Sequence, residues 1–299
     1  MYNILLVGNF GRGWDGSICD EEHIAKALES FGHKVTRIQR EKTHEAEWKY
    51  LRADFALIAQ WDNYFDDLIP RLRFFTDKII YWAFDLQDQN QVWHQKLIEG
   101  SDIYLSKRIA DSKYPNWQWF SQDFSPEFLH ARNEPIEKDI DILFTGSYLP
   151  WAEERNKTIV AVNAMFDLQI YSVNDWPKEW SLNVHPPVMD EGLMDLIPRA
   201  KICLAIDHTL EAGYWSDRAA QYICCGGFVL HRYVPMIESR FHHNVMYFHG
   251  VEDCLWQIGN WLEPAEDREV VAAEGYENNP YYKVRTKIAE LLEIIREKL

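Results

Sequence analysis

The sequence predicts an α/β protein made of two Rossmann-like, doubly wound domains that face each other across a cleft, with a C-terminal helix packing back. Short apolar runs, typical of strands buried on both faces, alternate with helical segments. The alternation is interrupted around residues 125–139, a polar stretch with two prolines, and then begins again. We therefore expect a first domain over 1–135, a second over 136–281 and a final helix over 282–299.

The first half begins with the clearest strand and helix signals. Residues 3–8 form an apolar run that ends in glycine, and residues 34–39 are expected to be the second strand. Between them, residues 20–33 carry apolar side chains on one helical face, with Asp20 as N-cap and Gly32 closing the C-terminus. Further strands are expected at 55–60, 78–85 and 103–106.

The second half repeats this pattern. Strands are expected at 140–147, 168–173, 202–207 and 227–232. Helices are expected at 152–165, 254–262, 267–278 and 282–299, the last with an apolar stripe. Open parallel sheets bind ligands beyond the carboxyl ends of their strands, so the loops that follow the strands are where functional residues are expected.

The composition is that of an ordinary globular protein with an acidic balance. Of its 299 residues, 47% are apolar and 26% charged, and 31 Lys and Arg against 47 Asp and Glu give a net charge of −16. This excludes an overall attraction to nucleic acid or anionic membranes, although it leaves room for a local basic cleft. No signal peptide, membrane-spanning apolar run or CxxC pair is visible, which favours a cytoplasmic protein with reduced thiols.

A glycine-rich loop follows the first expected strand. Residues 8–16, GNFGRGWDG, hold four glycines, and the backbone around Gly11 and Gly13 could approach an anion closely. The spacing differs from the nicotinamide-binding fingerprint, and no Gly-Lys-Ser/Thr follows, so neither a dinucleotide site nor a P-loop is predicted. An ordinary flexible loop is the alternative interpretation.

A charged residue opens an otherwise apolar helix in residues 213–235, GYWSDRAAQYICCGGFVLHRYVP. Ser216 or Asp217 is expected to cap this helix, which places Arg218 in its first turn. A positive charge there opposes the helix dipole. A bound phosphate would reverse the sign of that effect, because Arg218 and the helix amides would converge on it.

The rest of this helix leaves two interpretations open. Gln221 is expected on the same face as Arg218, and Gly226 and Gly227 are expected to end the helix without a side chain filling the cleft. In the alternative, Arg218 pairs with a nearby carboxylate on a solvated surface. The candidate partners are Asp207, Glu211 and Asp217.

The same segment resembles the donor-site region of the CgeB-like glycosyltransferases. Residues 214–238, YWSDRAAQYICCGGFVLHRYVPMIE, are similar to that family's pattern of S-D-R followed by C-G-G-F. Residues 139–157, DIDILFTGSYLPWAEERNK, resemble the start of the family's second domain, and residues 274–292 resemble its C-terminal tail. The resemblance covers residues 138–295 and is weak before them.

This resemblance implies a GT-B fold and transfer of a sugar from a nucleotide-diphosphate sugar to an acceptor hydroxyl, without a metal. It implies that Gly146 and Ser147 lie near the diphosphate and that Arg218 binds phosphate. Gln221 stands where the family usually has a ribose-binding glutamate, so a catalytically weak or inactive nucleotide-binding or interaction protein is the alternative. The expected donor-binding residues are Gly11, Gly13, Gly146, Ser147, Tyr214, Ser216, Asp217, Arg218, Gln221 and Gly226.

The resemblance also implies that any acceptor base comes from the first domain. The candidates after its strands are Asp15, His23 and Asp85. Each has a structural alternative, in which Asp15 bonds its own loop, His23 is satisfied in the first helical turn and Asp85 caps a turn. Asp139 and Asp141 spell the D-x-D of metal-dependent glycosyltransferases, but they precede a strand and supply too few oxygens for a hard cation.

The expected function is therefore that of a cytoplasmic, metal-independent glycosyltransferase. The acceptor could be a glycan, a protein, a small molecule or a modified nucleobase, and the acidic balance argues against duplex DNA. The glycine-loop spacing disfavours a nicotinamide oxidoreductase. The donor base, the sugar and the stereochemical outcome stay open.

Overall fold

The computed structural model describes residues 1–13, 15–40, 52–60, 67–84, 91–132, 136–263 and 265–298. The chain forms two compact units, one of Met1–Gln122 with Val284–Leu299 and the other of Asp123–Lys283. The boundary lies before the expected position near 135, because the start of the polar stretch is held by the second unit. There the indole nitrogen of Trp215 donates to Asp123 Oδ2 at 3.1 Å, and Ser125 forms a β-bridge with Lys283.

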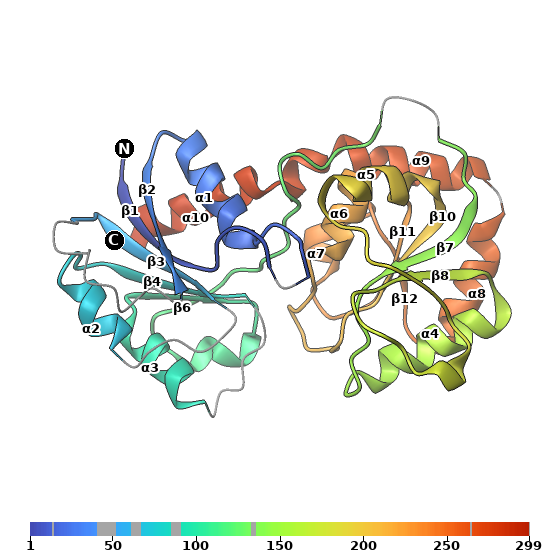
Figure 1. The fold of residues 1–299 in the computed structure, drawn as a ribbon, viewed down its shortest axis with the longest axis horizontal. Helices are drawn as coiled ribbons and strands as arrows, with labels where there is room; N and C mark the ends of the chain where they lie inside the picture. Colours follow the sequence, from blue (N-terminus) through green and yellow to red (C-terminus); the bar gives the residue numbers. More distant parts are fainter. Residues whose placement is uncertain are drawn as a thin grey trace. The chain divides into compact units, whose positions relative to one another are not determined.

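The first unit is built on a parallel sheet in the order β2-β1-β3-β4-β5-β6 (Figure 1). Its strands are β1 (Asn3–Gly8), β2 (Lys34–Gln39), β3 (Phe55–Gln60), β4 (Ile79–Ala83), β5 (Ile103–Ser106) and β6 (Trp117–Trp119). Its helices are α1 (Asp20–Ser30), α2 (Leu68–Arg73), α3 (Val92–Gly100), the 3-10 helix η3 (Ile109–Lys113) and α10 (Val284–Lys298). Helices α1 and α10 pack together on one face, and α2 and α3 cover the other (Figure 1).

The second unit is also built on a parallel sheet, in the order β12-β11-β10-β7-β8-β9 (Figure 1). Its strands are β7 (Ile140–Thr145), β8 (Leu168–Tyr171), β9 (Asn183–His185), β10 (Ala200–Ala205), β11 (Val229–Arg232) and β12 (Met246–Phe248). Its α-helices are α4 (Glu153–Met165), α5 (Leu193–Leu196), α6 (Arg218–Cys224), α7 (Glu238–Phe241), α8 (Val251–Leu262) and α9 (Ala265–Glu277). Short 3-10 helices are η4 (Lys178–Trp180), η5 (Asp190–Gly192), η6 (Ile197–Arg199) and η7 (Asn279–Tyr282).

Burial of the central strands explains why these sequences form parallel sheets. In β1, Ile4 to Val7 are all at most 2% exposed, and β4 is buried along its whole length. Strands covered by helices on both faces need such continuous apolar runs. The two parallel sheets confirm the predicted α/β class with doubly wound topology.

None of the helices in the described part of the chain combines the length and the apolar character needed to cross a bilayer.

Candidate functional site

The second sheet changes direction between β7 and β10. From β7 the chain continues outward through β8 to β9, then crosses to β10 and continues through β11 to β12. Ligands of open parallel sheets bind outside the carboxyl ends of the strands at such a switch point. Thr145 ends β7, and Ile206 and Asp207 come directly after β10. Functional side chains of this unit are therefore expected around these three residues.

Arg218 lies at this switch point and connects its two strands. It is the first residue of α6, and its guanidinium reaches back so that Nε donates to the Thr145 carbonyl at 2.7 Å and Nη1 to the Ile206 carbonyl at 3.2 Å. The side chain is only 15% exposed, and its Nη1 lies 3.9 Å from Oδ1 of Asp207, one of the partners considered from the sequence, so this ion pair is formed but is not on a solvated surface. Nη2 has no hydrogen-bond partner among the described residues.

Gly146 makes room for this arginine. A Cβ atom at this position would lie 3.0 Å from Nη2 of Arg218 and 2.9 Å from Cζ of Phe144. The Gly146 amide donates to the Tyr171 carbonyl at 3.0 Å, within the sheet. Gly146 therefore allows the guanidinium to approach, whereas its N–H is already used.

A second arginine, which is not among the expected donor-binding residues, lies against the same aromatic ring. Arg155 of α4 is 4% exposed, and its guanidinium carbon lies 5.0 Å from the Phe144 ring centroid, compared with 5.2 Å for Arg218. It donates to the Ser147 carbonyl, but its buried Nε has no partner among the described residues. Burial, followed by repulsion from Arg218, lowers the pKa of Arg155 to about 9.

The signal that could have identified Arg155 is its place on an apolar helical face. Ile159 and Val162 follow it at i+4 and i+7, and all three are buried. A charged residue on such a stripe is an exception that calls for a buried partner or a ligand.

Next to Arg218 lie a buried carboxylate, that of Asp207, and a buried imidazole, that of His231. Asp207 Oδ1 accepts from the Ser216 amide at 3.0 Å, and Oδ2 lies 3.4 Å from Nε2 of His231, a fully buried residue of β11. Although burial opposes it, interactions with the basic side chains of His231 and Arg218 lower the pKa of Asp207. The carboxylate is therefore ionised between two basic side chains.

The start of α6 differs from the capped helix expected from the sequence. Asp217 occupies the N-cap position but makes no side-chain cap hydrogen bond. Its carboxylate instead accepts from the Gln221 side-chain nitrogen, and the Ser216 amide binds Asp207. Tyr214 is 2% exposed and its hydroxyl lies 3.2 Å from Nδ1 of His208. With seven residues, α6 is too short for its amides to provide an anion site by themselves.

The two glycines after α6 have separate structural roles. Gly226 has φ +78°, and its amide donates to the Ile223 carbonyl, so it ends the helix in the left-handed conformation. At Gly227 a Cβ atom would lie 2.8 Å from both Cys203 and Ile197, so this glycine allows close packing on β10. The expectation that the pair keeps a cleft open is therefore wrong for Gly227, which faces the core.

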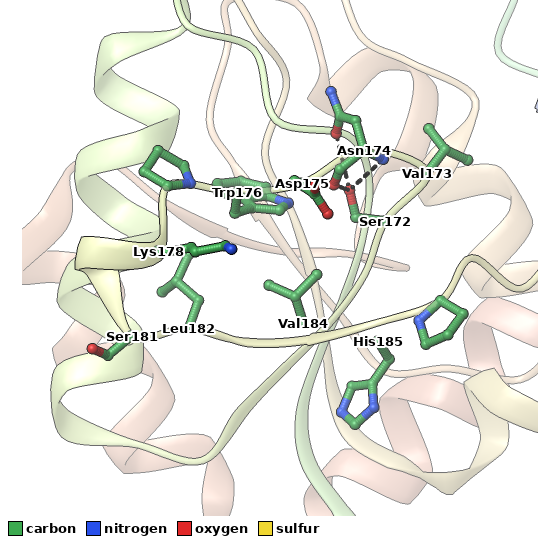
Figure 2. A pocket seen from close by; sticks show the side chains of 12 residues that line it. Ser172, Val173, Asn174, Asp175, Trp176, Lys178, Ser181, Leu182, Val184 and His185 are labelled. Atoms are coloured by element: carbon green, nitrogen blue, oxygen red, sulfur yellow. Dashed lines mark hydrogen bonds between the residues drawn. The ribbon is translucent and has the colours of Figure 1, made fainter.

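A pocket of about 500 Å³ adjoins the loop after β7, at the carboxyl ends of β8 and β9. Figure 2 shows Trp176 and Val184 on opposite sides of the hollow, with the Lys178 side chain between them. Asn174 ties this wall to the β7 loop, because its side-chain oxygen accepts from the Tyr148 amide at 2.7 Å. The pocket and Arg218 thus lie along the same edge of one sheet.

In the first unit, the glycine loop is folded back on itself. The Gly13 amide donates to the Ser17 carbonyl at 2.8 Å, and Gly11 has φ +87° with its carbonyl accepting from the Cys19 amide. Asp15 Oδ1 accepts from both the amide and the hydroxyl of Ser17, at 3.0 and 2.7 Å. The structural alternative for Asp15 is therefore the one observed.

The other two candidate bases give less information. His23 is 5% exposed in the first turn of α1, so it is not presented to solvent. Asp85 lies outside the described residues.

A buried carboxylate next to this loop, Glu21, was not expected from the sequence. Glu21 is 3% exposed, and its Oε1 accepts from the Asn9 amide at 3.0 Å, just beyond β1. Gly8 leaves space for it, because a Cβ there would lie 2.5 Å from Glu21 Cγ. Burial raises the pKa of Glu21 to about 7. The only sequence signal was the run of three acidic residues that opens α1, which is also a common helix start.

The acidic residues before β7 are paired with cations. Asp139 binds Arg199 with its two oxygens at 2.8 and 2.6 Å, and Asp141 lies 2.6 Å from Lys201. Among the described residues, no group of three His, Cys, Asp or Glu side chains is placed to hold a metal ion.

Comparison with solved structures shows that the chain has the predicted GT-B fold. An α-glucosyltransferase solved with UDP and a 13-mer DNA is 10% identical, with a TM-score of 0.71 over 99% of this chain and 100% of that one. Anabaena HepE with UDP and glucose is 10% identical, with a TM-score of 0.67 over 99% of this chain and 100% of that one. Sucrose-phosphate synthase from Thermosynechococcus elongatus is 9% identical, with a TM-score of 0.68 over 99% of each chain.

A search of curated proteins found no match to this chain. Residues 137–293, just over half of the chain and nearly all of the second unit, match the model of a family described as glycosyl transferase-like. This match includes the β7 loop, Arg155, Arg218 and α6. The chain therefore belongs to the glycosyl transferase-like family.

Proposed function

We propose that this chain transfers a sugar from a nucleotide-diphosphate sugar to an acceptor hydroxyl, and that its relatives of most similar specificity are the CgeB-like enzymes. One observation carries the proposal. Arg155, which is buried, and Arg218, which is 15% exposed, bring two guanidinium groups against the Phe144 ring at the switch point of the second sheet, and each keeps an N–H without a partner among the described residues. Buried cations that repel each other are stabilised when an anion lies between them.

A diphosphate is the anion that fits this arrangement best. Arginine presents a planar fork of donors that matches phosphate oxygens. Sugar transfer breaks the bond between the anomeric carbon and a diphosphate oxygen and forms a bond to the acceptor oxygen, whose proton leaves. Negative charge grows on the departing diphosphate, and fixed positive charges stabilise it without a metal.

Two further features support a nucleotide donor. Gln221 stands where the family usually has a ribose-binding glutamate, and the carboxylate of Asp217 lies beside it. This carboxylate supplies the negative charge that Gln221 lacks and so favours binding of the ribose hydroxyls. The pocket between Trp176 and Val184 offers space for another part of the donor along the same sheet edge. Because similar structures were solved with UDP, a uridine nucleotide is the first donor to test.

The acceptor is a hydroxyl of a glycan, protein, small molecule or modified nucleobase. Because the chain has a net charge of −16, a nucleobase in duplex DNA is the least favoured of these acceptors. A nucleotide-binding protein without transferase activity is the second candidate, favoured by Asp15 being bonded to its own loop rather than presented as a base.

Calorimetry with a panel of UDP, GDP, ADP and dTDP sugars in EDTA tests the proposal. We expect one base to bind, and expect Arg155→Met and Arg218→Lys to weaken that binding by about 10- to 150-fold, the value of about 1.5–3 kcal/mol for a hydrogen bond to a charged group. Lys157→Ala, an exposed lysine on the same helix as Arg155, serves as control and should bind like the wild type. The proposal fails if no nucleotide sugar binds, or if both arginine variants retain full affinity.

Acceptor-independent hydrolysis of the bound donor, followed by release of the free nucleotide, distinguishes the two candidates. A transferase should hydrolyse its donor slowly, whereas a protein that only binds nucleotides should leave it intact.

A further inference from the structure

We propose that His231 is a positioning residue that acts through Asp207 on Arg218, so that binding of the anionic donor takes up a proton. The inference rests on the proposed function and adds to it a role for two residues that do not touch the donor. It is carried by the contacts of the His231 ring and by the position of Asp207 between two basic groups.

The two ring nitrogens of His231 face different acceptors. Nδ1 lies 2.6 Å from the Arg232 carbonyl oxygen, a contact that requires a proton on Nδ1. Nε2 lies 3.4 Å from Oδ2 of Asp207, and both atoms are buried without a hydrogen-bond partner among the described residues. In the neutral imidazole the Nε2 lone pair therefore faces a carboxylate. A second proton turns this repulsion into an ion pair.

Asp207 transmits this change to Arg218. Its Oδ1 lies 3.9 Å from Nη1 of Arg218, so the carboxylate offsets part of the arginine charge. When His231 is protonated, the imidazolium compensates Asp207 instead. More of the Arg218 charge is then available to a diphosphate.

The charged groups around the pair come from several elements. Arg218 faces it from α6, Arg155 acts on Asp207 from α4, and Arg232 contributes its carbonyl from β11 itself. Burial lowers the pKa of His231, Asp207 opposes this effect, and Arg218 lowers it further. A diphosphate bound to Arg218 would cancel the last effect and raise the pKa of His231.

The sign of the pH dependence follows from this difference. The pKa of His231 is higher in the donor complex than in the free protein, so binding is coupled to proton uptake. Donor affinity is constant at high pH, rises by up to about tenfold per pH unit as pH falls between the two pKa values, and levels off below them. A nucleotide-diphosphate sugar is the suitable probe, because its diphosphate diester carries no proton that titrates near neutral pH.

Calorimetry of UDP-glucose binding in two buffers of different ionisation enthalpy measures the protons taken up. We expect uptake of up to one proton by the wild type and none by His231→Gln, because the glutamine amide does not titrate. The control His249→Gln, an exposed histidine after β12, should match the wild type. Equal proton uptake by the wild type and His231→Gln would overturn the inference.

A second measurement does not depend on the donor. The His231 imidazole, assigned by its absence from spectra of His231→Gln, is titrated by NMR in the wild type, Arg218→Met and Asp207→Asn. The pKa of His231 should rise in Arg218→Met and fall in Asp207→Asn. If it is unchanged in both variants, the inference is wrong. If both shifts occur while no nucleotide sugar binds, the proposed function fails and the coupling of the three residues stands.

Discussion

Replacing Arg155 by methionine should stabilise the ligand-free protein and weaken donor binding. Arg155 is a cation with 4% exposure that forms no ion pair within the described residues. Its guanidinium lies over the Phe144 ring and donates to the Ser147 carbonyl, while its buried Nε is unpartnered. Methionine keeps the length of the side chain and removes the charge.

The magnitude follows from the pKa of the buried group. Burial and the neighbouring Arg218 lower the pKa of Arg155 to about 9, so it is still charged at neutral pH. Relative to an ordinary arginine, this costs the folded state about 5 kcal/mol, at about 1.4 kcal/mol for each tenfold change. The contact with the Phe144 ring and the hydrogen bond to the Ser147 carbonyl offset part of this destabilisation. We expect Arg155→Met to raise the free energy of unfolding by about 1–3 kcal/mol, as apolar replacement of buried charges often does.

Urea denaturation at pH 7 and calorimetry with the bound nucleotide sugar measure the two effects separately. Lys157→Ala is the control, because this lysine is exposed on the same helix. Lower stability of Arg155→Met together with unchanged donor affinity would refute the reasoning, since it would show that the buried charge stabilises the fold and has no part in binding.

Further outcomes are expected elsewhere in the chain. Burial raises the pKa of Glu21 to about 7 from 4.5, so its contribution to stability is complete below pH 4.5 and is lost as pH rises through 7; Glu21→Gln should exceed the wild type by about 3 kcal/mol at pH 8 and match it at pH 4 in urea denaturation. Gly146→Ala should lose about 1–3 kcal/mol and bind donor more weakly, because its Cβ would meet Arg218 and Phe144. The matched change Gly259→Ala, in open space on α8, should instead gain about 0.5–1 kcal/mol in thermal unfolding. Donor hydrolysis should survive EDTA, and loss of turnover that Mg²⁺ restores would contradict this.

The sequence was sufficient to predict the central strands and the edge strand β2, but not the other three edge strands. β1 and β2 coincide with the expected ranges. A continuous apolar run marks β1, and the predicted helix that precedes β2 marks its start. β6, β9 and β12 were not predicted. Each has only three residues and lies at an end of its sheet, where one side is unpaired and no long apolar run is required.

The candidate site was predicted in part for a similar reason. The motif around Arg218 predicted its place at the start of α6 but not its contacts, which are to Thr145 and Ile206, residues 73 and 12 positions earlier. Contacts over such separations depend on the strand order, which the local pattern does not contain. Loss of the Arg218 side chain should therefore also lower stability, because its guanidinium links the ends of β7 and β10.

The arrangement of the two arginines makes sense only when the free and the liganded states are considered together. In the free protein Arg155 forms no ion pair within the described residues, Arg218 repels it, and Gly146 leaves the space that the Arg218 guanidinium occupies. The burial of Arg155 and its repulsion from Arg218 lower the stability of the free fold. One anion at the switch point would compensate both charges and use the free N–H groups, so binding energy becomes available where a diphosphate must be held and where charge must be stabilised as it leaves. A site built only for folding would have placed a carboxylate beside Arg155, or an apolar side chain in its place.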